Sequence, residues 1–219
     1  MSGRQAGGPR WVEVDPARLL RWLATFAERH GTPVQTVEEY AVRLAAPDGS
    51  TAVLHPPPGA PVPADLDDLV AGAAVVRRVG LLLARKGAVA VGVALGEELE
   101  VSKVDSHYVQ GRTAAGGWSQ QRFARRRDNQ AKAAAGDAAD LVLRLLVPVA
   151  VELAAVVTGG DRRAVDAVLA DPRLAPVAAL RSPRLLDVPE PRLVVLREAA
   201  RRARAVPILI DDRSAGTGP

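Results

Sequence analysis

The chain has no cysteine among its 219 residues. Disulfide bonds and thiolate chemistry, whether redox or metal-binding, are therefore excluded. The three histidines show no paired spacing with other metal-ligating residues, and the chain has neither a P-loop nor a dinucleotide-binding glycine motif. We therefore expect no metal site and no cofactor.

Aromatic residues and long apolar runs are also scarce. Phe, Trp and Tyr make up 3% of the chain, so Val, Leu and Ala must build the core of a protein that is 48% hydrophobic. No uninterrupted apolar run reaches the length of a transmembrane helix. The first ten residues lack the apolar segment of a secretory signal. We expect a cytoplasmic protein that does not bind membranes.

The positive charge of the chain is local rather than large. The formal net charge is +4, but residues 103–132 hold seven basic residues against two acidic ones. The seven are Lys103, Arg112, Arg122, Arg125, Arg126, Arg127 and Lys132. An arginine bias also arises from a GC-rich genome, and a charge run is often a solvated helix face. Beside the glycine-rich segment described below, we favour an RNA-binding surface.

Turn and capping residues divide the chain into four segments. Residues 1–10 and 213–219 are predicted to be disordered tails. Between them, the five prolines of residues 55–63 exclude regular structure and mark a linker or surface loop. The elements expected before and just after this stretch are a strand at 11–14, a helix at 15–30, strands at 37–44 and 51–54, and a helix at 65–78. These elements form an N-terminal part that covers residues 11–78.

Residues 79–212 form the second predicted part. It begins with three strands joined by tight turns, an antiparallel meander whose first two strands are almost wholly apolar and should be covered on both faces. A long helix is predicted from Ser119, the expected N-cap, to about Thr158. The other expected elements are strands at 79–84, 88–95, 99–110, 177–180 and 206–210, and helices at 161–170 and 193–205.

The most informative segment is the turn before the long helix. Residues 116–127 read Gly-Gly-Trp-Ser-Gln-Gln-Arg-Phe-Ala-Arg-Arg-Arg. Paired glycines let a backbone approach a substrate that any Cβ would obstruct. A glutamine amide both donates to and accepts from a water molecule, and arginines bind phosphates. The pattern indicates a loop that positions a water molecule beside a nucleic acid.

This segment resembles the Gly-Gly-Gln loop and following helix in the middle domain of eukaryotic and archaeal class-I release factors. Trp118 stands at the release-factor glutamine position, and Gly117-Trp118-Ser119-Gln120 fits better the Gly-x-x-Gln pattern of the Vms-like release factor (VLRF) family. The resemblance implies an α/β (α+β) fold, in which helices pack on a mixed central sheet and a long helix follows the loop. It also implies that residues 11–78 are the N-terminal part of the VLRF core and 79–212 its catalytic region.

The resemblance implies a peptidyl-tRNA hydrolase that frees nascent chains from stalled ribosomes or large subunits. It carries the catalytic role to Gln120, with Gly116 and Gly117 supplying the backbone of the loop and the adjacent Gln121 as the rival glutamine. The partners would be peptidyl-tRNA and the RNA of the large subunit. Contacts to RNA would come from Arg122, Arg125, Arg126, Arg127, Lys132, Arg112, Lys103 and Trp118.

Two alternatives remain open at this point. The loop could promote cleavage within the tRNA 3′ end, although only His107 nearby resembles a general base. The chain could also bind the ribosome without catalysis, as a release-factor relative that lacks the catalytic glutamine would. For Trp118, packing beneath the loop is as reasonable as stacking on a nucleotide.

Overall fold

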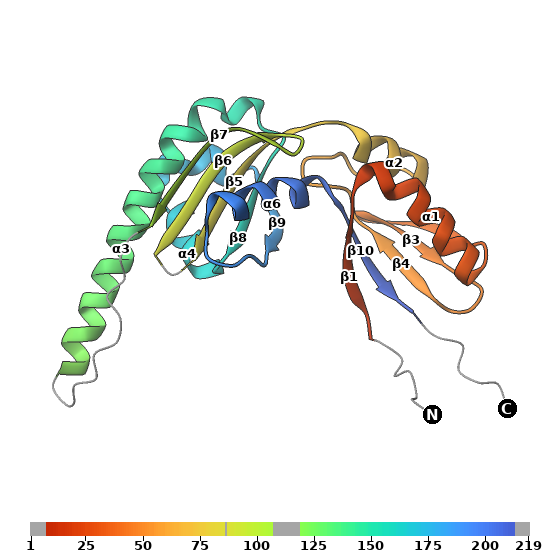
Figure 1. Ribbon diagram of the computed structural model, residues 1–219, viewed down its shortest axis with the longest axis horizontal. Helices are drawn as coiled ribbons and strands as arrows, with labels where there is room; N and C mark the ends of the chain where they lie inside the picture. Colours follow the sequence, from red (N-terminus) through yellow and green to blue (C-terminus); the bar gives the residue numbers. More distant parts are fainter. Residues whose placement is uncertain (1–7, 86, 107–118, 213–219) are drawn as a thin grey trace. The chain divides into compact units, whose positions relative to one another are not determined.

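The computed structural model describes residues 8–85, 87–106 and 119–212, and at residues 106, 119–129 and 131 it describes the backbone alone. The chain divides into two compact units. Unit 1 contains the residues up to 76 and from 204 onward, and unit 2 contains residues 77–203. Each unit is built on one five-stranded sheet with helices packed on it (Figure 1), which confirms the predicted fold class.

Unit 1 is an antiparallel sheet with two helices. Its elements are β1 (Arg10–Val14), α1 (Pro16–His30), β2 (Val34–Glu38), β3 (Ala41–Ala45), β4 (Thr51–Leu54), α2 (Leu66–Ala74) and β10 (Val206–Asp211). The strand order is β1-β10-β4-β3-β2, and every neighbouring pair is antiparallel. Figure 1 shows α1 and α2 on the same face of this sheet.

The ends of α1 are fixed by local chemistry, as predicted. The Asp15 side chain accepts a hydrogen bond from the Ala17 backbone N–H, and Pro16 begins the helix. At the other end Gly31 has a φ of 87°, and its N–H donates to the Ala27 carbonyl. The helix buries its apolar stripe against the sheet, with Phe26 only 5% exposed.

The core of unit 1 lies between the helices and one face of the sheet. Alternate residues of β10 point into it, because the side chains of a strand alternate between faces. The strand residues buried in this core are Val14 of β1, Val206, Ile208 and Ile210 of β10, Ala52 and Leu54 of β4, and Val42 and Leu44 of β3.

Unit 2 is a mixed sheet covered on both faces. Its elements are β5 (Arg78–Arg85), β6 (Ala88–Leu95), β7 (Glu98–Ser106), α3 (Ser119–Leu145), the 3₁₀ helix η1 (Val147–Glu152), β8 (Ala155–Gly160), α4 (Arg162–Leu169), η2 (Pro172–Leu174), α5 (Ala175–Ala178), β9 (Arg181–Leu186) and α6 (Leu193–Arg204). The strand order is β7-β6-β5-β8-β9. The β5-β6-β7 meander is antiparallel, whereas β5, β8 and β9 run parallel.

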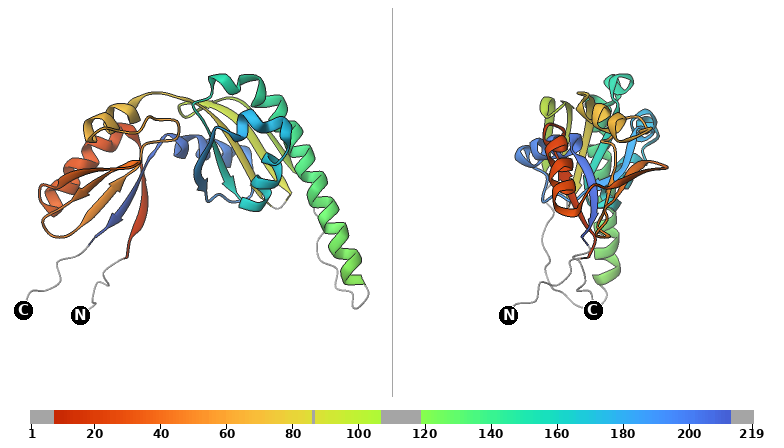
Figure 2. Two further views of the ribbon diagram at one scale, coloured as in Figure 1. Left: turned by 180° about the vertical axis from the view of Figure 1, so that it is seen from behind. Right: turned by 90° about the vertical axis from the view of Figure 1, so that its right-hand side faces the viewer.

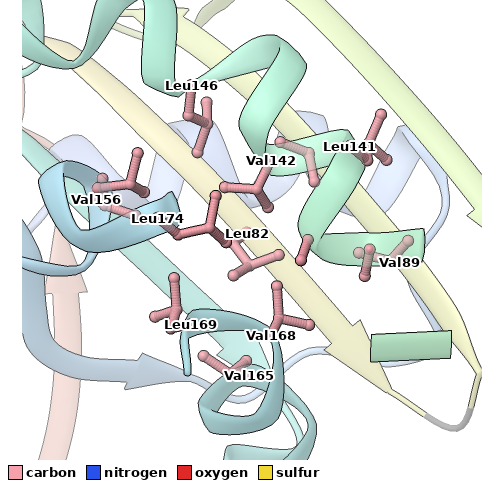
Figure 3. Close-up of a cluster of buried hydrophobic side chains, with 14 of the residues drawn as sticks. Leu82, Val89, Leu141, Val142, Leu146, Val156, Val165, Val168, Leu169 and Leu174 are labelled. Carbon is pink, nitrogen blue, oxygen red and sulfur yellow. The ribbon is translucent and has the colours of Figure 1, made fainter. Parts of the chain in front are cut away.

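Two apolar clusters hold the helices of unit 2 to its sheet. On one face Leu82 of β5 is fully buried among residues of α3, α4 and η2, such as Val142 and Leu174 (Figure 3). On the other face α6 packs through Leu196 and its alanines against Leu81 and Leu83 of β5. The strands β5 and β6 are buried on both faces, as their continuous apolar runs predict.

The structure corrects the predicted helix from Ser119 to Thr158. The α-helix ends at Leu145, η1 follows, and the last apolar residues of the predicted helix form β8. Pro148 has no N–H for an α-helical hydrogen bond, and a short apolar run is ambiguous between a helix and a buried strand. The strand predicted at 177–180 is also wrong, because residues 175–178 form α5 and the strand β9 follows.

Two predicted strands of the sheet in unit 1 also differ from the structure. Residues 37–44 are not one strand, because the chain turns at 39–40 between β2 and β3. The last strand, predicted within the 79–212 part, lies in the sheet of unit 1 between β1 and β4. Its side chains complete the core of unit 1, so packing between residues far apart in sequence decides its place.

Candidate functional site

The candidate site lies between two elements of unit 2, the strand β7 and the helix α3. The edge strand β7 ends at Ser106, and α3 begins at Ser119. Lys103, one of the predicted RNA contacts, is exposed on β7 opposite Val91 of β6. The predicted residues between β7 and α3 lie outside the described part of the chain: His107, Arg112, Gly116, Gly117 and Trp118.

Both candidate catalytic glutamines belong to the first turn of α3. The helix begins at Ser119, so Gln120 and Gln121 are its second and third residues. Arg122, Arg125, Arg126 and Arg127 follow within the next two turns of backbone. The helix therefore brings the two glutamines and four of the predicted RNA-binding arginines into one stretch of about 11 Å along its axis.

The N-terminal part of α3 reaches beyond the core of unit 2. The helix has 27 residues and is therefore about 40 Å long. Among the side chains that the structure describes, Ala135 is the first of α3 to pack on the core, and Ala138 is the first to be buried. In Figures 1 and 2 the first turns of α3 run past the end of the sheet. Gln120 thus lies about 22 Å along the helix from Ala135.

Lys132 is the predicted contact farthest from the glutamines on this helix. Its side chain is exposed, as is that of Gln130. Twelve residues separate Gln120 from Lys132, which corresponds to about 18 Å along the helix. A ligand that touches both the first turn and Lys132 must therefore be long, as a nucleic-acid strand is.

The C-terminal part of α3, from Ala135 onward, is held to the rest of unit 2 by apolar packing. It is also held by an ion-pair cluster that the sequence analysis did not predict. One nitrogen of the Arg173 guanidinium donates to Asp140 of α3 at 2.8 Å and to Asp171 at 2.6 Å. Hydrogen bonds from Arg173 hold the pKa of Asp171 at about 2, below the ordinary 3.8. The cluster joins α3 to η2, but Asp140 lies 33 residues from Arg173 in sequence, and no sequence motif links the two.

Among the described residues there is neither a metal centre nor a membrane span. In the described ranges there is no group of three or more His, Asp or Glu side chains placed to hold a metal ion. Nor does that part of the chain contain a helix long and apolar enough to cross a membrane. What the geometry provides is an anchored helix that carries two glutamines and several arginines at its far end.

A family model described as "Actinobacteria/chloroflexi VLRF1 release factor" matches residues 77–209, more than half of the chain. No curated protein matches the chain.

Two solved archaeal structures resemble the chain at low identity. One, described as "Archaeal protein", is 19% identical with a TM-score of 0.39, over 74% of this chain and 51% of its own. The other is a crystal structure of the archaeal translation termination factor aRF1, 17% identical with a TM-score of 0.42, over 91% of this chain and 65% of its own. The chain thus spans between half and two thirds of the length of these relatives.

Proposed function

The chain belongs to the Actinobacteria/chloroflexi VLRF1 release-factor family, and we propose from this that it hydrolyses peptidyl-tRNA on stalled ribosomes or large subunits. The observation that carries the proposal is the place of Gln120, in the first turn of a helix whose other end is embedded in unit 2. Such a helix delivers a small polar group into a narrow space that the body of the protein cannot enter.

The reaction requires little from the protein beyond positioning. A water oxygen forms a bond to the ester carbonyl carbon, the bond from that carbon to the terminal ribose oxygen breaks, and the ribose oxygen takes a proton. The Gln120 amide orients the water and donates to the developing oxyanion. The glycines Gly116 and Gly117 leave room for the substrate beside it. Losing one donor to an oxyanion typically lowers a rate about 10²- to 10³-fold.

In this proposal the arginines of α3 bind the RNA. Arg125 and Arg126 follow Arg122 by three and four residues, which makes them its neighbours along the helix backbone. Guanidinium groups bind phosphates with paired hydrogen bonds. Together with Arg127, Lys132, Arg112, Lys103 and Trp118 they would contact the tRNA and the RNA of the large subunit. This assignment places the protein in translation quality control in the cytoplasm.

The test is peptide release from purified large subunits that carry peptidyl-tRNA. We expect wild-type protein to release the peptide and to leave the tRNA intact. Gln120→Ala should slow release by about 10² or more, the cost of removing one oxyanion donor. Gln130→Ala is the matched control, because it removes an exposed glutamine from the same helix ten residues away.

Each other outcome points to a different function or residue. Loss of release in Gln121→Ala alone moves the catalytic role to Gln121. Release of peptide that still carries nucleotides indicates cleavage in the tRNA 3′ end rather than ester hydrolysis. Tight binding of wild-type protein to the subunit without release refutes the hydrolase and leaves a non-catalytic ribosome-binding factor.

A further inference from the structure

The outer edge of β2 differs from the other sheet edges of the molecule. An edge strand exposes unpaired backbone groups, and natural sheets protect such edges with charges or proline. The three other edge strands have this protection. They carry Pro183 with Arg181 and Arg184 in β9, Glu98, Glu100, Lys103 and Asp105 in β7, and Arg10 and Glu13 in β1.

The strand β2 instead reads Val-Gln-Thr-Val-Glu and has one charge at its end. That charge, Glu38, forms an ion pair with Arg43 of the neighbouring strand β3. The side chains of Val34 and Val37 are 71% and 48% exposed. No strand in the described part of the chain pairs with the outer side of β2. The stretch from Val34 to Val37 has neither charge nor proline and includes the β-forming residues Val34, Thr36 and Val37, so it is open to another strand.

The two faces of β2 are unequal, which restricts how a partner strand can pair. The register with β3 sets Val37 beside Val42, a fully buried core residue, so Val37 and Gln35 lie on the face that the helices cover. Val34, Thr36 and Glu38 lie on the other face. A partner that continues the sheet must extend the apolar core beyond Val37.

We propose that β2 pairs antiparallel with β2 of a second copy of this chain, across a twofold axis at Thr36. Thr36 then lies opposite Thr36 of the second copy. Val37 lies opposite its Gln35 and diagonal to its Val37, which extends the apolar core on that face. Each Glu38 lies opposite a Val34, at opposite ends of the paired segment, so no like charges face each other. An isologous contact of this kind uses the same residues twice and closes at two copies.

The small size of the contact sets its strength. Five paired residues span about 17 Å. Strand pairing of this length buries less than the roughly 1,200 Å² that stable complexes usually exceed. The dimer should therefore be reversible, and its population should rise with protein concentration.

The first experiment measures mass in solution. Sedimentation velocity of the whole chain should show a monomer at low concentration and a growing dimer fraction over a roughly hundredfold increase. Val34→Lys and Val37→Lys place lysine on the edge and should weaken association at least tenfold. Val62→Lys is the matched control, because Val62 is an exposed valine of the same unit outside any strand. A monomer at every concentration, or equal weakening by Val62→Lys, would overturn the proposal.

The second experiment uses the absence of cysteine, which leaves no background thiol. Residues opposite each other in antiparallel strands have Cα atoms about 4.5–5.5 Å apart, within the range that a disulfide bridges. Under mild oxidation Thr36→Cys should form a covalent dimer much faster than Val62→Cys. Thermal melting of each variant shows that it is folded. Equal rates of crosslinking in the two cysteine variants would contradict pairing at Thr36.

Discussion

Replacing Gly160 with alanine should destabilise unit 2 strongly. Gly160 ends β8 with a φ of +96°, a conformation that costs an alanine about 1–2 kcal/mol. A Cβ built there lies 2.4 Å from the carbonyl oxygen of Ala84 in β5. That oxygen already accepts the N–H of Asp161, the N-cap of α4, at 2.8 Å. The new methyl group must therefore displace backbone at a point where two strands and a helix meet.

The size of the effect follows from these two terms. Forced overpacking typically adds about 1–3 kcal/mol to the conformational cost, which gives a total of about 2–5 kcal/mol. In a unit of this size about 1 kcal/mol lowers the melting temperature by about 4 °C. We therefore expect a fall of roughly 8–20 °C in the unfolding transition of unit 2, measured by differential scanning calorimetry.

The matched control is the same substitution at Gly136, in the middle of α3. No atom lies within 4 Å of a Cβ built at Gly136, so alanine meets no obstacle there. Because alanine is favoured over glycine in a helix by about 1 kcal/mol, Gly136→Ala should raise the transition of unit 2 slightly. If Gly160→Ala melts with the wild type, or if the two variants shift in the same direction, the described end of β8 is wrong.

Two further predictions concern the arginines of α3 and the ion-pair cluster around Arg173. The triple variant Arg122→Gln, Arg125→Gln, Arg126→Gln should bind large subunits more weakly and with a shallower salt dependence. The control is Arg197→Gln, at an exposed arginine of α6, which should leave binding unchanged. If the triple variant keeps the salt slope of the wild type in a filter-binding assay, these arginines do not contact phosphates. Because the pKa of Asp171 is lowered to about 2 in the folded protein, its carboxylate stabilises the fold above about pH 4 and loses that effect as the pH falls to about 2. Asp171→Asn should therefore lower the melting temperature at pH 7 and converge with the wild type near pH 2, and a difference that persists there would contradict the ion-pair cluster.

The predictable parts of the fold are those decided by neighbouring residues. Asp15, Pro16 and Gly31 fix both ends of α1 through their own backbone chemistry, so the sequence predicts this helix closely. The strands β5 and β6 are also predictable from local sequence, because a continuous apolar run indicates a strand that is covered on both faces. The apolar run from 147 to 160 is predicted wrongly as part of a helix, because apolar residues alone do not distinguish a helix from a buried strand.

The candidate site divides in the same way. The glutamines and arginines of α3 are predictable because a short motif holds them together and a helix keeps their spacing. The bond from Arg173 to Asp140 is not predictable, since it depends on how η2 packs against α3. The placement of β10 in unit 1 depends equally on the whole sheet, because both strands that flank it belong to the first quarter of the chain.

The position of β10 has a consequence for the synthesis of the protein itself. The last strand of unit 1 to leave the ribosome is β10, which lies between β1 and β4, and all of unit 2 is translated before it. Unit 2 can fold while the chain is still being made, but β1 and β4 must wait with their inner edges open until residue 211 emerges. The pairings of β10 with β1 and β4 join residues far apart in sequence, so they form late. Until then the open strand edges can pair wrongly. A chain that ended after unit 2 but before β10 would keep a complete unit 2, whereas the sheet of unit 1 would lack its inner strand.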